Sequence, residues 1–271
     1  MLLQQRAAVW RPFFIEEGSA ATGAASKVPM PTPTTAFRLL AAGAGLALAI
    51  GLGACASPDL APEPIADAPV LPGGWHAVAL PGKLRTHYSQ ARKDGRDAVA
   101  ARSERSASML RKRMQIAPEK LGPVSFSWWV DDLVAGADVA DIDREDAPAR
   151  VMFGFDGDTS KLPRRTRMMF DLAEALSGER PPYATLMYVW DASAPVGTVI
   201  VNPRSDRIRK IVVDSGPLNL KRWRDHRRDL RADFRLAFGE DPGTLQSIAV
   251  MTDSDNTRSS ALSWYGAVTF H

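Results

Sequence analysis

The sequence from residue 73 onward predicts an all-β fold, a sandwich of two sheets with one or two short helices inserted. Short segments with a period of two follow one another, separated by Gly, Pro, Asp and Asn. In several segments one alternate set is large and apolar, as with Val151, Phe153 and Phe155, while the opposite set is mixed. Two packed sheets bury both kinds of face. Only two segments have helical spacing, and neither alternates with strands in the βαβ order of a parallel sheet.

The strands are predicted from this alternation and from the turn residues between them. Many short strands at such spacing are typical of a β-sandwich. The predicted strands, in chain order, are residues 75–80, 85–91, 98–104, 109–116, 124–130, 150–156, 185–190, 198–201, 208–214, 245–252 and 264–270.

A first helix is predicted over residues 161–176. Four apolar residues recur at the i, i+3, i+4, i+7 spacing of one helix face, and Ser160 can cap the N-terminus. The residues of this face are Met169, Leu172, Ala173 and Leu176.

A second, shorter helix is predicted over residues 229–238. Leu230, Phe234 and Ala237 or Phe238 recur at helical spacing. Gly239 and then Pro242 end the segment, as expected at a helix C-terminus.

The N-terminal part contains an apolar run, residues 39–54, behind the single Arg38. The run is 16 residues long, below the roughly 20 that a helix needs to cross a bilayer, and it ends in small residues as a secretory signal does. It therefore predicts a cleaved signal peptide. Residues 52–55, Leu-Gly-Ala-Cys, resemble the lipobox of bacterial lipoproteins, which implies that Cys55 is lipidated and becomes the new N-terminus.

The chain is accordingly divided into a leader, a tether and one domain. Residues 1–54 are the leader, in which 1–29 are interpreted as a misassigned start before Met30 and 30–54 as the lipoprotein signal peptide. Residues 55–73 are a Pro-rich tether that favours extended conformations. Residues 74–271 form the β-sandwich. No Asp follows Cys55 directly, which resembles lipoproteins sorted to the outer membrane, so we expect a lipid-anchored protein of the cell envelope that faces the periplasm.

Charge and cysteine content exclude several function classes. The whole chain has a net charge of +3, but four basic residues and two acids precede Cys55, which leaves +1 for the rest. A nearly neutral domain argues against a nucleic-acid partner, whose binding depends on many phosphate contacts. Once Cys55, the single cysteine, carries lipid, no thiol remains for catalysis, a disulfide or a thiolate metal site.

Several segments match a known family in order: FSWWV (126–130), EDAPARV (145–151), LMYVW (186–190), RDLRADFRLAFGEDP (228–242), and IAVMTDSDNT (248–257) followed by WYGAVTF (264–270). With these segments the chain resembles the domain of unknown function family 3047, found in bacterial envelope proteins. Glu145 stands where the family usually has an aspartate. The resemblance implies a jelly-roll-like sandwich, similar to galactose-binding-like and carbohydrate-binding modules, and supplies no reaction.

A group of oxygen ligands follows the strand that ends near residue 252. Asp253, Asp255 and Asn256 lie within four positions and, with Asp146 from another strand, offer the hard ligands that Ca²⁺ prefers. Asp and Asn also make turns by bonding their own backbone. Two interpretations stay open, a structural turn and a calcium ion that stabilises the sandwich; no other cofactor is predicted.

Asp146 and Asp253 are also the candidate catalytic residues. A glycosidase holds two carboxylates roughly 5 to 9.5 Å apart across a sugar, and this is the pair to test. Alternatively, Glu145 and Asp146 form an ion pair with Arg150 inside the fold, because carboxylates near a buried guanidinium are usually its bidentate partners. We favour the ion pair.

Aromatic side chains offer flat faces on which sugars stack, although most are expected in the core. Trp129 lies on the strand face opposite Trp128, and Trp223 lies in a charged segment interpreted as a loop. These two are the better candidates for exposure. The predicted ligand-binding candidates are Trp129, Trp223, Arg150 and Trp190.

Residues 221–235 are dense in arginine but interleaved with aspartates, which predicts a solvated, salt-bridged face; a patch for anionic lipid phosphates is the alternative. No HExxH, GxSxG or phosphate-binding glycine motif occurs. The sequence therefore favours a non-catalytic module that binds glycan or polysaccharide in the envelope. A hydrolase acting on envelope polysaccharide and a purely structural lipoprotein remain alternatives.

Overall fold

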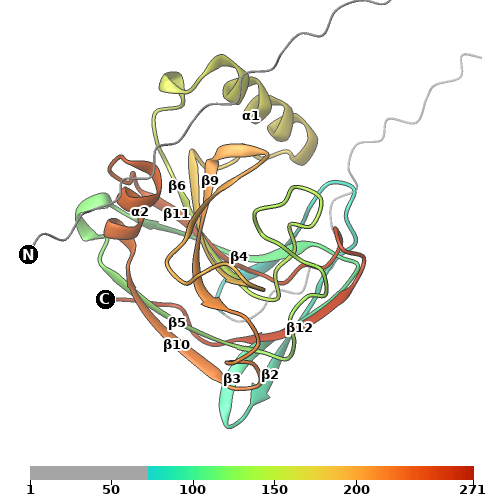
Figure 1. The fold of residues 1–271 in the computed structure, drawn as a ribbon. Helices are drawn as coiled ribbons and strands as arrows, with labels where there is room; N and C mark the ends of the chain where they lie inside the picture. The colour runs from blue at the N-terminus through green and yellow to red at the C-terminus, as the bar shows by residue number, and fades with distance from the viewer. Residues whose placement is uncertain (1–72) are drawn as a thin grey trace, which may run out of the picture. The chain divides into compact units, whose positions relative to one another are not determined.

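The alternating segments pair into two curved sheets that face each other across an apolar core (Figure 1). The computed structural model describes residues 73–271, so the predictions for the leader and most of the tether lie outside the described residues. A β-sandwich with two inserted helices confirms the predicted fold class.

The first sheet has seven strands in the order β1-β4-β11-β6-β7-β9-β8. Neighbours are antiparallel, except that β7 and β9 run parallel. In chain order these strands are β1 (Trp75–Ala79), β4 (Ser108–Ile116), β6 (Arg150–Phe155), β7 (Ala184–Asp191), β8 (Val199–Asn202), β9 (Ser205–Ser215) and β11 (Leu245–Met251).

The second sheet has six strands, five of them in the order β10-β5-β12-β3-β2, with β13 paired to β5. The predicted last strand, 264–270, is divided into two strands by residues 266–268. The strands are β2 (His87–Lys93), β3 (Arg96–Glu104), β5 (Pro123–Val130), β10 (Trp223–Asp229), β12 (Ser260–Tyr265) and β13 (Thr269–Phe270).

The main core lies between the sheets and contains most of the aromatic residues. Trp128, Trp190 and Tyr188 are fully buried there, with Phe153 and Phe155 from β6. A smaller apolar cluster covers the other face of the first sheet, where residues of the β5–β6 connection pack on its strands. Every residue of β6 is therefore buried. Both clusters are built from residues of the described segment, so this segment carries its own core.

Strand β10 was not predicted, and the placement of Trp223 in a loop is wrong. The salt-bridged face expected over 221–235 does form, with alternate residues of the strand exposed. Trp223–Asp229 pairs with β5 as the edge of the second sheet. Its inward-facing polar side chains find partners on the first sheet and on α2 (Leu230–Phe238): Arg224 and His226 bind Asp214, and Arg228 binds Asp233. Burial alone would raise the pKa of Asp214, but hydrogen bonds from His226, Arg224 and Trp128 outweigh it, so the pKa is lowered.

The prediction of the second helix is confirmed. For the first helix the position is confirmed, but the start and the N-terminal cap differ from the prediction. Asp229 caps α2, and left-handed Gly239 ends it. The first helix, α1, spans Arg164–Ser177 and ends at left-handed Gly178. Ser160 does not cap it: Ser160 lies in a preceding 3-10 turn, Thr159–Lys161, and Pro163 stands at the N-terminus without a side-chain cap. A second 3-10 turn, Pro118–Lys120, precedes β5.

Candidate functional site

A buried ionic network lies on the outer side of the first sheet, beneath the β5–β6 connection. Its centre is Arg150, on β6 and 2 % exposed. Asp253 binds this guanidinium through both carboxylate oxygens, at 2.9 Å from Nε and 3.0 Å from Nη2. Asp253 also accepts the backbone N–H of Ala147 at 3.1 Å. Burial raises the pKa of Asp253 to about 6, and the charge and hydrogen bonds of Arg150 oppose the rise. The pair is therefore ionised at neutral pH.

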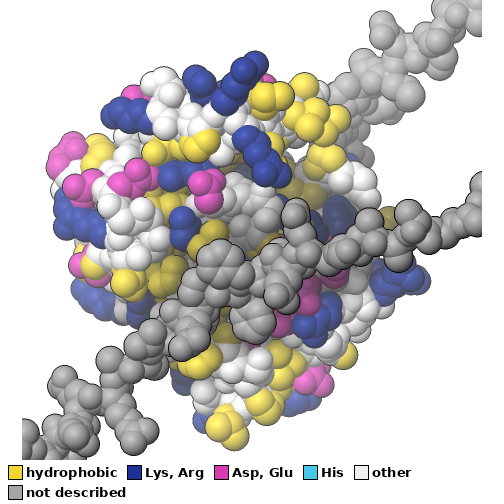
Figure 2. All heavy atoms as spheres, turned by 45° about the horizontal axis from the view of Figure 1, so that its top comes forward, with side chains coloured by type: hydrophobic (Ala, Val, Ile, Leu, Met, Phe, Trp, Pro, Cys, Tyr) yellow, Lys and Arg dark blue, Asp and Glu magenta, His cyan; other side chains and the backbone are white. Residues whose placement is uncertain are grey.

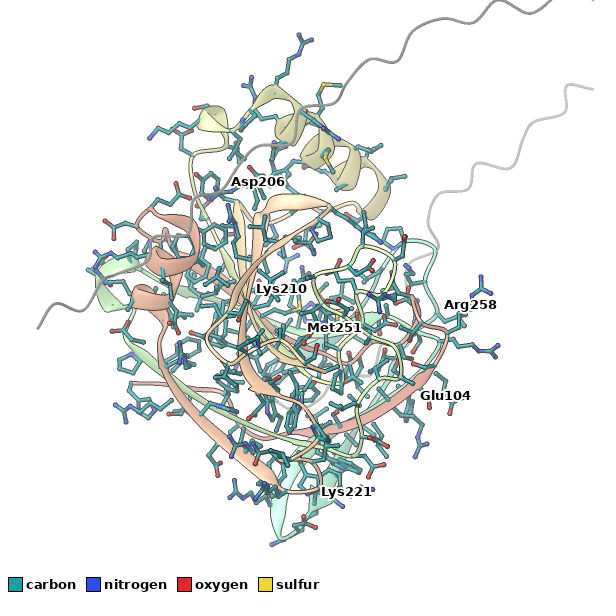
Figure 3. The ribbon with its side chains drawn as sticks, in the orientation of Figure 1. Glu104, Asp206, Lys210, Lys221, Met251 and Arg258 are labelled. Atoms are coloured by element: carbon teal, nitrogen blue, oxygen red, sulfur yellow. The ribbon has the colours of Figure 1, made fainter. Side chains whose placement is uncertain are left out.

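Lys210 extends the network from β9 and is fully buried. Figure 3 shows it in the interior, whereas Glu104, Lys221 and Arg258 lie at the periphery. Its ammonium group lies 2.7 Å from the Glu145 carboxylate and donates to the carbonyl of Val139. Asn202 donates to the same carboxylate oxygen at 2.6 Å. Burial, together with the charge of Arg150, lowers the pKa of Lys210 to about 8, while Glu145 opposes the shift.

Asp146 plays a different part from the one expected. Arg150 was expected to pair with Glu145 and Asp146. Its main partner is Asp253 instead, and the Glu145 carboxylate lies further away, 3.8 Å from Nη1. Asp146 instead accepts the backbone N–H groups of Asn256 (3.2 Å) and Thr257 (2.7 Å). It thereby holds the turn after β11.

Three of the four predicted calcium ligands converge, whereas the Asn256 side chain donates to the carbonyl of Ile142 at 3.2 Å. Oxygens of Asp146, Asp253 and Asp255 all lie within 4.8 Å of one another. Each carboxylate already has partners, however: Arg150 for Asp253, backbone N–H groups for Asp146, and Lys83 for Asp255. A cation bound here would compete with the two positive side chains, Arg150 and Lys83. The arrangement therefore fits a structural cluster whose polar groups bond one another better than it fits a calcium-binding site.

Asp146 and Asp253 are brought together, but as neighbours in a closed cluster. They are 0 % and 4 % exposed, and their nearest oxygens are closer than the carboxylates of a glycosidase, which flank a sugar at roughly 5 to 9.5 Å. Chemically, this cluster holds the β5–β6 connection on the sheet.

The outer face of the second sheet carries a different feature, a row of three tryptophans. Trp129 on β5 is directly opposite Trp223 on β10 and Trp264 on β12. Directly paired residues share one face of a sheet, and three adjacent strands span about 10 Å. We call these residues the tryptophan row. The two candidates Trp129 and Trp223 thus lie together, and Trp264 joins them.

Trp129 is more buried than the sequence suggested, with 5 % exposure, whereas Trp223 and Trp264 are half-buried. The rings of Trp129 and Trp264 meet edge to face at 4.9 Å. The indole N–H of Trp129 has no hydrogen-bond partner within the described residues. A buried donor without a partner costs about 1 to 3 kcal/mol, and this N–H lies inside the row, away from solvent.

The tip of the β2–β3 hairpin covers the tryptophan row with cations. Lys93 Nζ lies 3.9 Å from the ring centre of Trp129, and Arg96 lies 5.1 Å from that of Trp223. Trp223 donates its indole N–H to the carbonyl of Lys93 at 3.1 Å. Asp225, beside Trp223, binds Arg96 through both carboxylate oxygens. The face therefore combines partly exposed rings with cations that lie over them.

The other two candidates lie apart from the tryptophan row. Trp190 is fully buried in the main core and donates its indole N–H to the carbonyl of Gly216 at 3.1 Å. Arg150 is enclosed in the ionic network. Neither side chain faces an opening.

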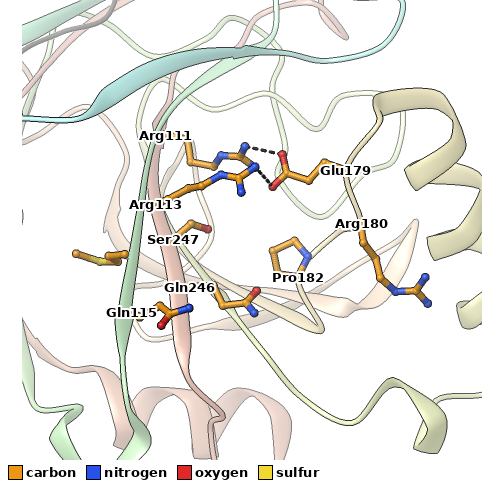
Figure 4. A pocket seen from close by; sticks show the side chains of 9 residues that line it. Arg111, Arg113, Gln115, Glu179, Arg180, Pro182, Gln246 and Ser247 are labelled. Atoms are coloured by element: carbon orange, nitrogen blue, oxygen red, sulfur yellow. Dashed lines mark hydrogen bonds and ion pairs between the residues drawn. The ribbon is translucent and has the colours of Figure 1, made fainter.

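Other grooves open away from the tryptophan row in the described part of the chain. One, of about 680 Å³, lies between the sheets and is lined by apolar residues such as Trp75, Leu110 and Val268. Another, of about 460 Å³, lies on the outer face of the first sheet, where Arg111 and Arg113 both bind Glu179 (Figure 4). Both bind it closely, at 2.6 and 2.9 Å.

Sequence reasoning missed Lys210, Lys93 and the partnership of Trp264 with Trp129. Lys210 carried a usable signal, since it stands directly before the apolar run 211–213 in a predicted strand. Lys93 precedes the Asp-Gly pair of a hairpin, which predicts the turn but not what the tip covers. The register that aligns the tryptophans carries no local signal.

A family profile described as "Protein of unknown function (DUF3047)" matches residues 73–269. No curated protein matches the sequence.

Solved structures with a similar fold include carbohydrate-active proteins. A family 11 carbohydrate-binding module from Clostridium thermocellum, in complex with a mixed-linked tetrasaccharide, has a TM-score of 0.36 and 10 % identity over 75 % of this chain and 91 % of that one. The xyloglucanase domain of NopAA from Sinorhizobium fredii, in complex with cellobiose, has a TM-score of 0.40 and 9 % identity over 73 % and 93 %. A cellulase derived from Cel12A of Rhodothermus marinus has a TM-score of 0.39 and 12 % identity, over 73 % of this chain and 93 % of that one. At these TM-scores the similarities carry no argument on function.

Proposed function

The chain belongs to the DUF3047 family, and we propose that it is a lipid-anchored envelope protein whose β-sandwich binds glycan without cleaving it. The anchor is Cys55. The binding face is the outer side of the second sheet.

The tryptophan row is the observation that carries this proposal. Sugars bind proteins by stacking their apolar faces on aromatic rings while polar groups take their hydroxyls. Trp223 and Trp264 offer the partly exposed rings, and the more buried Trp129 packs between them. Arg96 and Asp225, which bind each other, form an exposed ion pair at the edge, where hydroxyl groups can reach it.

Binding is favoured over hydrolysis because of the state of the candidate acids. Asp253 is bound to Arg150 through both oxygens, and Asp146 is used by backbone N–H groups. A general acid or base must reach the substrate within hydrogen-bond distance, and these buried groups have no opening to it.

Removal of a partly exposed tryptophan is expected to weaken glycan binding. The chain from residue 55 on, with Cys55→Ser, is screened on a glycan array, and the tightest glycan is then titrated by calorimetry. Trp264→Ala and Trp223→Ala should each weaken binding roughly 5- to 30-fold, because each removes a stacking face worth about 1 to 2 kcal/mol.

Trp75→Ala is the matched control, since Trp75 is a half-buried tryptophan on the first sheet. It should leave the affinity unchanged. Equal loss in all three variants, or no glycan bound at all, would contradict the proposed face. Release of product from the bound glycan, abolished by Asp146→Asn in a protein that still melts cooperatively, would favour the hydrolase.

Lipidation is tested separately in cells. Metabolic labelling with palmitate should mark the wild-type protein and miss Cys55→Ser, because the thiol is the acceptor in the proposed reaction. Equal labelling of both proteins would refute the anchor and leave the glycan proposal standing. Within the described residues, no helix is long and apolar enough to span a membrane.

A further inference from the structure

Helix α1 turns an apolar stripe away from the protein. Met168, Met169, Leu172 and Leu176 are 61 %, 44 %, 60 % and 64 % exposed. The predicted helix face is therefore real but unburied, and Phe170 is the one buried residue of α1. A surface helix normally packs such a stripe on the core. Figure 1 shows α1 at the outside of the fold, beyond β6 and β9.

The orientation of α1 is fixed by contacts on its other side. Phe170 and Leu162, just before the helix, are each 6 % exposed. Directly after the helix, Glu179 binds Arg111 at 2.6 Å and Arg113 at 2.9 Å, both on β4 (Figure 4). These anchors at both ends hold the stripe outward.

Two arginines precede the apolar residues on the same helix face. Arg165 lies in one row with Met169, Leu172 and Leu176, at spacings of four, three and four residues, and Arg164 precedes Met168 by four. Among the described residues, no carboxylate pairs with either arginine. The acids of α1, Asp171 and Glu174, both bind Arg180, at 3.0 and 2.9 Å. Figure 2 shows Lys and Arg side chains beside exposed apolar ones near the top of that view.

We propose that α1 is a membrane-docking helix that lies in the headgroup region of a bilayer containing anionic phospholipids. Helices of this kind bury an apolar face at the acyl boundary and place cations at the phosphates. The arginine stems can cover apolar surface while their guanidinium groups reach the headgroups. The anchor proposed at Cys55 would bring the protein to such a bilayer.

The charges around the apolar stripe favour an anionic bilayer over a second copy of the chain as its partner. In a symmetric dimer each stripe meets the same surface of its partner. Arg164 and Arg165 would then enter the interface, while Asp171 and Glu174 are already engaged by Arg180. Anionic headgroups supply the missing negative charge.

Vesicle co-sedimentation tests the helix without the lipid anchor, so its result is independent of lipidation and of glycan binding. The chain from residue 55 on, with Cys55→Ser, is mixed with vesicles of equal parts phosphatidylglycerol and phosphatidylcholine, or of phosphatidylcholine alone. We expect the protein to bind the vesicles that contain phosphatidylglycerol, and to bind vesicles of phosphatidylcholine alone more than about tenfold more weakly. Arg164→Gln and Arg165→Gln should each lower the partition coefficient about fivefold at low salt. Leu172→Ser should lower it about tenfold or more.

Two variants outside α1 serve as controls. Leu218→Ser removes an equally apolar side chain that is 86 % exposed, and Arg102→Gln removes an exposed cation on β3. Both should bind like the parent protein, and all variants should keep its melting curve. Equal binding by Leu172→Ser and the parent protein, or no binding to the anionic vesicles, would overturn the proposal. Self-association that Leu172→Ser abolishes, without vesicle binding, would assign the stripe to a second copy.

Discussion

Asp253→Ala is expected to lower the free energy of unfolding by about 3 to 5 kcal/mol, because it leaves a buried guanidinium without its main partner. Arg150 is 2 % exposed and would keep the carbonyl of Glu145 at 2.8 Å and its carboxylate at 3.8 Å. The N–H of Ala147 would lose its acceptor as well. For a domain of this size the loss corresponds to a fall in melting temperature of roughly 6 to 20 °C, measured by circular dichroism at neutral pH.

Asp255→Ala is the companion variant, because Asp255 belongs to the same cluster but pairs with the partly exposed Lys83. Because the Lys83 side chain is 42 % exposed and is hydrated once its partner is lost, this variant should lose less stability than Asp253→Ala. An unchanged melting curve for Asp253→Ala would refute the buried network. A chelator is expected to leave the wild-type curve unchanged. A fall with chelator that is absent from both variants would instead show a calcium ion held by these carboxylates.

The stability of the domain is expected to rise with pH between about 8 and 9.5 because of Lys210. Its pKa is lowered to about 8 in the folded protein, by burial first and by Arg150 second, whereas an unfolded lysine titrates near 10.4. Between these values the unfolded chain binds one proton more than the folded protein, so the slope of unfolding free energy against pH is positive. The gain by pH 9.5 is up to about 2 kcal/mol. Urea unfolding at a series of pH values measures it.

Lys210→Met isolates this contribution, since methionine fills similar space without a titrating group. Glu145 keeps Asn202 as a partner in the variant. The rise between pH 8 and 9.5 should vanish, and parallel profiles of variant and wild type would exclude Lys210 as its source. The window ends below pH 10 because burial raises the pKa of Tyr265, and of Tyr88 and Tyr188, in the folded state. Unfolded tyrosines lose their protons from about pH 10, which lowers stability again.

The sequence by itself determined the fold class, most strands and the second helix. These follow from local patterns: alternation for the strands, and Leu230, Phe234 and Gly239 for α2. Burial of Trp128 and Tyr188 follows from the same alternation, whereas Trp190, predicted as a ligand-binding candidate, is buried in the core. Such patterns suffice where one face of an element packs on the core and the other meets solvent.

The partnerships that build the candidate sites were decided only by the tertiary structure. Strand β10 escaped prediction because its inward side chains are charged, and their burial depends on Asp214 and Asp233, which lie outside the strand. The tryptophan row depends on the register of three strands that are distant in sequence. For α1 the period was visible, but which face is buried depends on Phe170 and on the anchor of Glu179 to β4. Local spacing sets the period of an element, whereas the partner across a sheet is set by long-range pairing that neighbouring residues do not encode.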